Sequence, residues 1–295
     1  MHGFFVAFGF GLVTAAILAF SAVAFSLQYG VSNHPNFAHG ELLTIGAYAA
    51  YVSQTLTTNL VVGGAAAAVT GGLVAWGMNR GIVEPFVRAR ARSLVIFIAT
   101  IGVAIIIQNS LLAAFTGTNV VYVLPQTAPH RVGPFLWTSR DELIMGAAAV
   151  TMVLLHLLLR YTKFGKALRA VADSRELARV SGIDASRVIQ LTWGLAGLVA
   201  GLGGFVLAGR VGSFAPSLGF NFLLVTFAAA IVGGIGKPYG AMAGALLVGV
   251  AMETSAFYVA ADYKLPIAFA LLIATLLVRP EGLFTTKPRV GGGAA

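Results

Sequence analysis

Long apolar stretches constrain the fold of this chain more than any single motif does. The first 40 residues contain no Asp, Glu, Lys or Arg, and the run from Gly3 to Leu27 is long enough to cross a hydrocarbon core of about 30 Å. Hydrophobic residues make up 58% of the 295 residues and charged residues only 10%, which is too little polar surface to cover a soluble globule of this size. The sequence therefore predicts an all-α polytopic membrane protein, with residues 1–295 forming a single transmembrane domain.

The apolar segments predict eight or nine transmembrane helices. They lie at residues 3–27, 42–57, 61–78, 93–115, 142–159, 188–208, 221–235, 239–259 and 265–278. The second and seventh are short enough to be re-entrant. A long span, a polar break containing Pro and a short span occur at residues 4–57 and again at 188–235, starting on opposite sides of the membrane. This pattern favours an inverted repeat, an arrangement that places broken helices around a transport pathway.

Residues 160–187 form the one strongly charged segment, with ten of the 29 charged residues of the chain. Apolar residues from Phe164 to Val171 recur at helical spacing, which predicts a short amphipathic helix. Asp173 and Glu176 have the form of a capping box for a second short helix, and Gly182 suits its end. We therefore expect a helix, a turn and a helix, with the basic side chains facing outward.

The basic residues also predict the orientation of the chain in the membrane. If residues 160–187 are cytoplasmic, strict alternation of the spans places residues 80–92, Lys237 and a short tail at 280–295 on the same side. Those segments, with Arg279 at the start of the tail, hold 15 of the 19 Lys and Arg residues. The positive charge therefore indicates membrane orientation rather than a nucleic-acid partner. The N-terminus is then outside, although a re-entrant second segment would reverse this.

Polar residues gather where Pro35 and Gly40 are expected to interrupt the helices, at Asn33, His34, Asn36, His39 and Glu41. One interpretation is that they line or gate a pathway, because polar groups at membrane depth are costly to bury. The alternative is that they cap two helices and form hydrogen bonds across the bundle. His34, His39 and Glu41 have the residue types of a metal site, but the sequence offers no further residue to orient them, so we predict no metal.

No motif for chemistry is present in the sequence. The segment GGIGKP at 233–238 lacks the first Gly and the final Ser or Thr of a phosphate-binding loop, and the chain has no cysteine. We expect no enzyme activity and no cofactor, so ATP would have to be bound by another subunit. Glu41, Glu253 or Asp262 could instead carry protons or sodium coupling in a secondary transporter. Small residues at helical spacing predict close helix contacts at Gly197, Gly201, Gly236, Gly240 and Gly244.

Three blocks of this sequence resemble the branched-chain amino acid ABC transporter permeases of the LivH type. They are YGVSNHPNFAHGELLTIGAY at 29–48, TKFGKALRAVADSRELARVSGID at 162–184, and FAAAIVGGIGKPYGAMAGALLVG at 227–249. The blocks stand in the family's order and the resemblance covers most of the chain. The chain departs from the family pattern at His34, at Pro35 and at Lys237-Pro238, which affects the expected substrate more than the expected family.

The resemblance implies a bacterial inner-membrane permease that pairs with a second, homologous permease among membrane lipids. Two cytosolic ATPases and a periplasmic binding protein would complete the transporter. The substrate would be branched-chain amino acids or a similar small solute; urea, short amides and aromatic acids are alternatives. The implied ATPase-coupling residues are Phe164, Gly165, Lys166, Arg169, Ala170, Asp173, Glu176, Ala178, Arg179, Gly182 and Ile183. The implied pathway residues are Asn36, Phe37, His39, Gly40 and Glu41.

Overall fold

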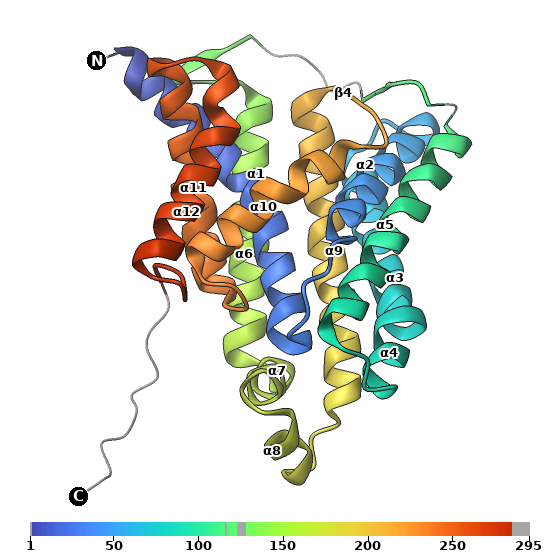
Figure 1. Ribbon diagram of the computed structural model, residues 1–295. Coiled ribbons are helices and arrows are strands. Elements are labelled where there is room, and N and C mark those ends of the chain that lie inside the picture. Colours follow the sequence, from blue (N-terminus) through green and yellow to red (C-terminus); the bar gives the residue numbers. More distant parts are fainter. Residues whose placement is uncertain (1, 116, 123–127, 285–295) are drawn as a thin grey trace, which may run out of the picture.

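The computed structural model describes residues 2–115, 117–122 and 128–284, and nearly all of its regular structure is helical. All nine predicted apolar segments form helices. These are α1 (His2–Ser32), α2 (His39–Leu56), α3 (Leu60–Met78), α5 (Ser93–Ala114), α6 (Ser139–Tyr161), α9 (Ala185–Val211), α10 (Leu218–Gly233), α11 (Pro238–Tyr258) and α12 (Lys264–Val278). They stand side by side in one bundle (Figure 1).

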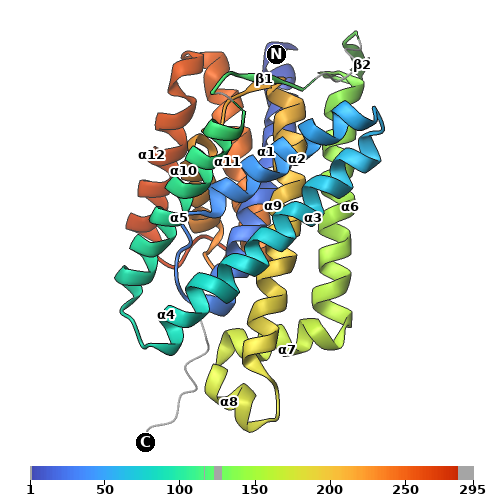
Figure 2. The same cartoon turned by 90° about the vertical axis from the view of Figure 1, so that its right-hand side faces the viewer.

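Short elements connect these helices at the two ends of the bundle. Helical connections are η1 (Asn79–Val83), a π-helical turn that joins α3 to α4 (Glu84–Arg88), then α7 (Lys163–Asp173), α8 (Arg175–Val180) and the 3-10 turn η2 (Ala261–Tyr263). Strand β1 (Val120–Val121) pairs antiparallel with β4 (Ser213–Phe214). Strand β2 (His130–Val132) pairs antiparallel with β3 (Phe135–Trp137). The two small sheets cover one end of the bundle (Figure 2).

The helices differ in how far they cross the bundle. Within the described residues, seven helical segments are long and apolar enough to span a membrane, and α10 is a shorter apolar helix. Helix α2 follows an irregular segment, residues 33–38, that leads from the end of α1 back into the bundle (Figure 1). The two segments predicted to be short, α2 and α10, are therefore the ones that start within the bundle rather than at its ends.

The segments that were predicted to lie on one side of the membrane are found at one end of the bundle. Helices α4, α7 and α8 and the turn between α10 and α11 lie at one end, whereas the N-terminus and the small sheets lie at the other (Figures 1 and 2). Because α2 carries the chain to the far end, the N-terminus and the charged α7–α8 segment lie at opposite ends. Of the predicted tail at 280–295, residues 285–295, including Lys287 and Arg289, lie outside the described residues.

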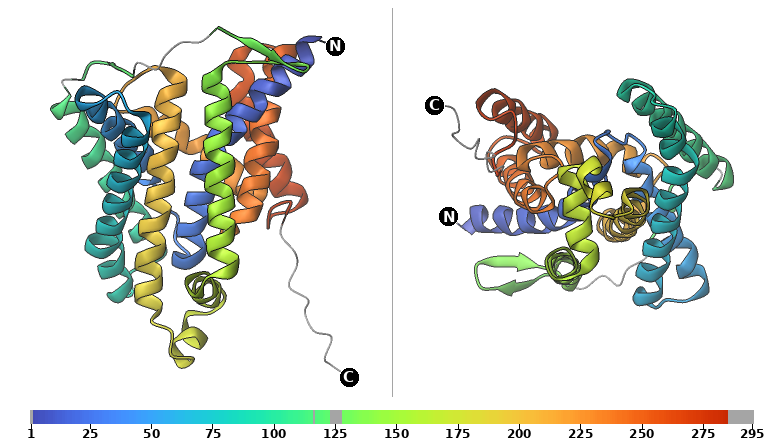
Figure 3. Two further views of the ribbon diagram at one scale, coloured as in Figure 1. Left: turned by 180° about the vertical axis from the view of Figure 1, so that it is seen from behind. Right: turned by 90° about the horizontal axis from the view of Figure 1, so that it is seen from below.

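Two groups of helices repeat the same packing in opposite directions. Helix α9 packs against α3, and α1 packs in the same way against α11. Helix α2 lies between α3 and α9, and α10 correspondingly lies between α11 and α1. Helices α1 and α9 run in opposite directions through the bundle (Figures 1 and 3). The structure thus contains the inverted repeat that the sequence pattern favours, with α1 to α5 as one half and α9 to α12 as the other.

Glycine residues allow helix backbones of one half to touch helix backbones of the other half. A Cβ atom at Gly201 would collide with the Ala67 carbonyl of α3, and one at Gly249 would lie 2.5 Å from the Ala15 nitrogen of α1. Gly40 and Gly219 make the equivalent contact between α2 and α10, each facing the carbonyl oxygen of the other. Small residues provide such contacts in membranes, where van der Waals packing replaces the hydrophobic effect between helices.

We predict that Gly201→Val lowers the thermal midpoint of the detergent-purified protein by several degrees, because overpacking a close contact costs about 1–3 kcal/mol. Gly146→Val is the matched control, since a Cβ at this position in α6 meets no atom within 4 Å. Equal midpoints for the two variants would show that the α3–α9 contact is looser than the structure indicates.

Candidate functional site

The break between α1 and α2 is built from residues 33–38. Asn33 has a left-handed backbone with φ of 57° and its N–H donates to the Tyr29 carbonyl at 2.7 Å, which ends α1. The Asn36 side chain then accepts a hydrogen bond from Ala38 N at 3.1 Å, just before α2 begins. The expectation that Gly40 also interrupts the helix is wrong. Gly40 lies in the first turn of α2, where its missing side chain leaves room for Gly219.

A buried polar cluster joins this break to α1 and α10. Gln28 is its hub, because its side-chain oxygen accepts from Asn36 Nδ2 at 3.2 Å and lies 3.1 Å from His39 Nδ1. The other imidazole nitrogen of His39 lies 3.1 Å from the Ser21 carbonyl, and the Ser21 hydroxyl pairs with Thr226 Oγ1 at 2.8 Å. All five side chains are at most 1% exposed. The cluster therefore fixes the angle between α1, α2 and α10.

The five predicted pathway residues fall into different surroundings. Asn36 and His39 belong to the buried cluster, and Gly40 lies against α10. Phe37 is half-buried and its ring meets three aromatic rings from α5 and α10 at centroid distances of 5.6 to 6.1 Å: those of Phe97, Phe220 and Phe227. For Asn36 and His39, the geometry favours the interpretation that they hold helices together across the bundle.

Glu41 differs from the other polar residues of this region. It is 1% exposed, and neither carboxylate oxygen has a hydrogen-bond partner among the described residues. The hydroxyl of Tyr48, seven residues along the same face of α2, is likewise buried without a partner. Helices α2 and α10 begin beside each other at Gly40 and Gly219. Neither N-cap residue makes a side-chain cap, but the Thr44 hydroxyl of α2 accepts from Gly219 N at 3.0 Å. Glu41 thus leaves an unpaired carboxylate close to the point where the two broken helices meet, and Tyr48 lies two turns further along α2.

The two other carboxylates proposed for ion coupling, and His156 of α6, lie away from this meeting point. Glu253 forms an ion pair with Lys264 at 2.7 Å and accepts a hydrogen bond from Thr14 at 2.9 Å. Asp262 lies exposed in η2, and His156 lies 3.1 Å from the Tyr239 hydroxyl. No group of three His, Asp or Glu side chains suited to a metal ion occurs in the part of the chain that the structure describes.

The charged segment folds as the predicted helix, turn and helix, with α7 followed by α8. Leu168 and Val171 of α7 are buried against the bundle. The predicted capping box at Asp173 is wrong by one residue, because α7 continues through Asp173 and the Ser174 side chain caps α8 by accepting from Leu177 N at 3.3 Å. Gly182 has φ of 81° and follows the end of α8, as predicted.

The basic side chains of this segment do not all face outward as predicted. The Arg169 guanidinium donates to the Leu159 carbonyl near the end of α6, and the Arg175 guanidinium donates twice to the Val31 carbonyl near the end of α1. The last carbonyls of a helix lack partners within it, so these arginines satisfy them. Burial and the Arg175 charge lower the pKa of His34, which lies at the break and pairs with Ser93 at 2.9 Å. The hydrogen bonds from Arg175 to the Val31 carbonyl therefore attach α8 directly to the end of α1, where the break starts.

One face of α8 contacts no other part of the described chain closely. Leu177 is 70% exposed and Val180 is 88% exposed, and α8, which carries both, lies at the tip of the molecule (Figure 1). Arg179 and Glu176 are also exposed there. An apolar pair surrounded by charges is typical of a surface that another protein covers.

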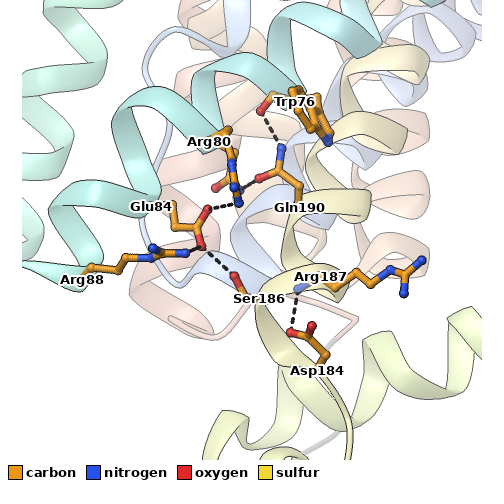
Figure 4. A network of polar contacts seen from close by, with 9 residues as sticks. Trp76, Arg80, Glu84, Arg88, Asp184, Ser186, Arg187 and Gln190 are labelled. Atoms are coloured by element: carbon orange, nitrogen blue, oxygen red, sulfur yellow. Dashed lines mark hydrogen bonds and ion pairs between the residues drawn. The ribbon is translucent and has the colours of Figure 1, made fainter.

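A second polar network connects the end of α3 to the start of α9 (Figure 4). Glu84 pairs with Arg88 at 2.6 Å and accepts a hydrogen bond from Ser186 at 2.6 Å. Gln190 donates to the Trp76 carbonyl at 2.6 Å and accepts from Asn79 at 2.5 Å, beside the π-helical turn η1. The sequence analysis missed this network, although Asn79 and Gln190 are polar residues at the ends of apolar helices.

An inverted-repeat bundle of membrane helices with two broken helices meeting inside it defines a membrane transport protein. The family model described as "Branched-chain amino acid transport system / permease component" matches residues 7–276. The chain belongs to this family of permease components, which are not enzymes, and it is a multi-pass protein of the inner membrane.

Named relatives agree with the family. The chain is 31% identical to the high-affinity branched-chain amino acid transport system permease protein LivH of Salmonella typhimurium, over 92% of each chain. It is 29% identical to BraD, the corresponding permease protein of Pseudomonas aeruginosa, over 92% of this chain and 93% of BraD. The galactose/methyl galactoside import permease protein MglC of Haemophilus influenzae is 33% identical over 47% of this chain and 43% of its own. No solved structure matches the chain.

We predict that Gln28→Leu and His39→Leu destabilise the protein by about 1–3 kcal/mol each, because each leaves a buried partner unsatisfied. The double variant should lose less stability than the sum of the losses in the two single variants, because it removes both partners of the Gln28–His39 hydrogen bond. Thermal unfolding of the four proteins in detergent measures this coupling.

The matched comparison combines Gln28→Leu with Thr70→Val, whose hydroxyl bonds only to carbonyls of its own helix. The losses of stability from Gln28→Leu and Thr70→Val should be additive. Additive effects for Gln28 and His39 as well would contradict the description of Gln28 as the hub of the cluster.

Proposed function

We propose that this chain is a permease subunit of an ABC importer, through which branched-chain amino acids or a similar small solute cross the inner membrane. The observation that supports this most strongly is the similarity to LivH, which extends over 92% of both chains rather than over one block. The family match and the bundle of broken helices support the same proposal. Energy would come from ATP bound by separate subunits, so the chain itself would need no cofactor.

In this proposal α7 and α8 form the ATPase-coupling segment. Leu177 and Val180 present an apolar face at the tip of the molecule, and Arg179 adds a charge beside it. A movement of α8 would reach α1 through the two hydrogen bonds from Arg175 to Val31, directly before the break at residues 33–38. The remaining coupling candidates from Phe164 to Ile183 would act by holding α7 and α8 against the bundle.

The solute would pass beside the meeting point of α2 and α10. Helix N-termini at this depth carry partial positive charge, which suits a carboxylate, and the unpaired Glu41 suits an ammonium group. A zwitterionic amino acid has both groups. Phe37 and the surrounding aromatic rings would contact its apolar part.

The proposed complex contains a second homologous permease, two cytosolic ATPases and an extracytoplasmic binding protein. The binding protein would meet the end of the bundle that carries β1 to β4, opposite to α8 (Figure 2). A proton- or sodium-coupled carrier is the second candidate. The ion pair of Glu253 with Lys264 leaves Glu41 as the main residue that could carry such coupling. Uptake that persists with an uncoupler and stops on ATP depletion would support the importer over this carrier.

We predict that Val180→Glu leaves the protein folded but reduces co-purification of the ATPase subunits by at least about tenfold, because apolar anchors dominate such interfaces. Val132→Glu, at the opposite end of the bundle, is the control and should retain them. Equal recovery of ATPase with both variants would remove α8 from the coupling interface.

We predict that Glu41→Gln lowers substrate uptake by at least about tenfold while ATPase association stays normal. The variant keeps the size of the side chain but removes the charge that an ammonium group would meet. Glu281→Gln, the same change at an exposed glutamate outside the proposed pathway and the coupling segment, should transport normally. Normal uptake with Glu41→Gln would exclude Glu41 from the pathway.

A further inference from the structure

A charged cleft lies between the end of α3 and the start of α9, away from the meeting point of α2 and α10. It has a volume of about 510 Å³ and is lined by Trp76, Arg80, Arg88, Ser186, Arg187 and Gln190, among others. Helix α4, which supplies Arg88 to the cleft, lies at the same end of the bundle as α7 and α8 (Figure 2), and several of the lining residues are drawn in Figure 4. In the predicted orientation the cleft faces the cytoplasmic surface of the membrane. The network of Glu84 with Ser186 and the bonds of Gln190 hold its two walls together.

Positive charge exceeds negative charge in this cleft. Arg80 and Arg88 share the single carboxylate of Glu84, with Arg80 at 3.7 Å and Arg88 at 2.6 Å. The two arginine side chains remain 62% and 69% exposed. Asp184 is occupied as the cap of α9, where it accepts from the backbone N–H of Arg187 at 3.0 Å. The cleft therefore presents guanidinium donors that can take an additional anion.

The two walls change from apolar to cationic in the direction of the cytoplasm. On α3, the exposed residues Leu73 and Trp76 are three positions apart, and Arg80 follows four positions later in η1, which continues the helix. On α9, the exposed residues Leu198, Leu191 and Arg187 also share one helix face, at spacings of seven and four. Trp is typical of the membrane–water interface, and Leu of the hydrocarbon region. A phospholipid has the same order of parts, with acyl chains, a glycerol region and then a phosphate.

We propose that this cleft binds the phosphate of an anionic phospholipid of the cytoplasmic leaflet. Arg80, Arg88 and Arg187 contact the headgroup, and the acyl chains lie along Leu73 and Leu191 beside Trp76. A freely soluble anion would use the arginines but not the exposed leucines above them. Basic pockets between membrane helices at the cytoplasmic side are the usual form of such lipid sites.

The test is native mass spectrometry of the full chain, purified from nanodiscs with equal amounts of phosphatidylglycerol and phosphatidylcholine. We expect retained phosphatidylglycerol to exceed phosphatidylcholine, and the double variant Arg80→Gln/Arg187→Gln to retain at least about tenfold less of it. The control Arg131→Gln/Arg160→Gln changes the charge by the same amount at exposed positions outside the cleft and should retain the lipid. Circular dichroism melting of each variant establishes that it is folded.

Equal retention of the two lipids by the unaltered protein would overturn the proposal. Equal loss of phosphatidylglycerol in the two double variants would overturn it as well, because the effect would then come from net charge alone. If the lipid is bound only until the ATPase subunits are added, the cleft is a protein contact and the proposal is wrong. Retention that survives assembly and depends on Arg80 and Arg187 supports it.

Discussion

Contact between helix backbones at glycine residues is the interaction on which the rest of this structure depends. At Gly201 and Gly249, a long helix of one half approaches a long helix of the other half so closely that a Cβ would collide with backbone atoms. Gly40 and Gly219 bring the two broken helices together in the same way. Because lipid supplies no hydrophobic drive for association, this close packing is what holds the inverted halves in register.

The polar groups of the bundle divide into those that are satisfied and those that are not. Asn36 and His39 both bond to the Gln28 side-chain oxygen and fix the break between α1 and α2, while Gln28 Nε2 has no partner among the described residues. Glu41 and Tyr48 have no such partners, and they lie on the neighbouring helix face. Arg175 joins this region, through the Val31 carbonyl, to the end of the bundle that carries α7 and α8. The same short break is thus in contact with the interior, where a solute would pass, and with the helix that would meet an ATPase.

Much of this fold could be predicted from the sequence, because apolar stretches and breaking residues act locally. All nine segments and the two short helices α7 and α8 follow from hydrophobic length, periodicity and Gly182. Apart from the cap of α8, which was placed one residue too early, the errors arose from contacts between distant residues. The sequence shows that Arg169 and Arg175 are basic, but not that helix ends with unpaired carbonyls lie within their reach. Gly40 resembles a helix breaker in the sequence, whereas its role is set by Gly219, far along the chain.

The candidate site was predicted less completely than the fold for the same reason. Residues near the break were identified as a group, but only the packing separates His39, which is satisfied, from Glu41, which is not. The Glu84 network was missed because its members come from α4 and α9 and share no local pattern.

The two inverted halves place the break before α2 inside the membrane. Helix α2 then carries the chain to the side of the membrane opposite to the end of α1. Since the chain contains no cysteine, single cysteines at Thr58, after α2, and at Ser181, after α8, can be labelled in intact cells with a membrane-impermeant maleimide. The structure predicts that Thr58→Cys is labelled from outside and Ser181→Cys only after the membrane is permeabilised. Labelling of both positions from the same side would contradict the inverted arrangement.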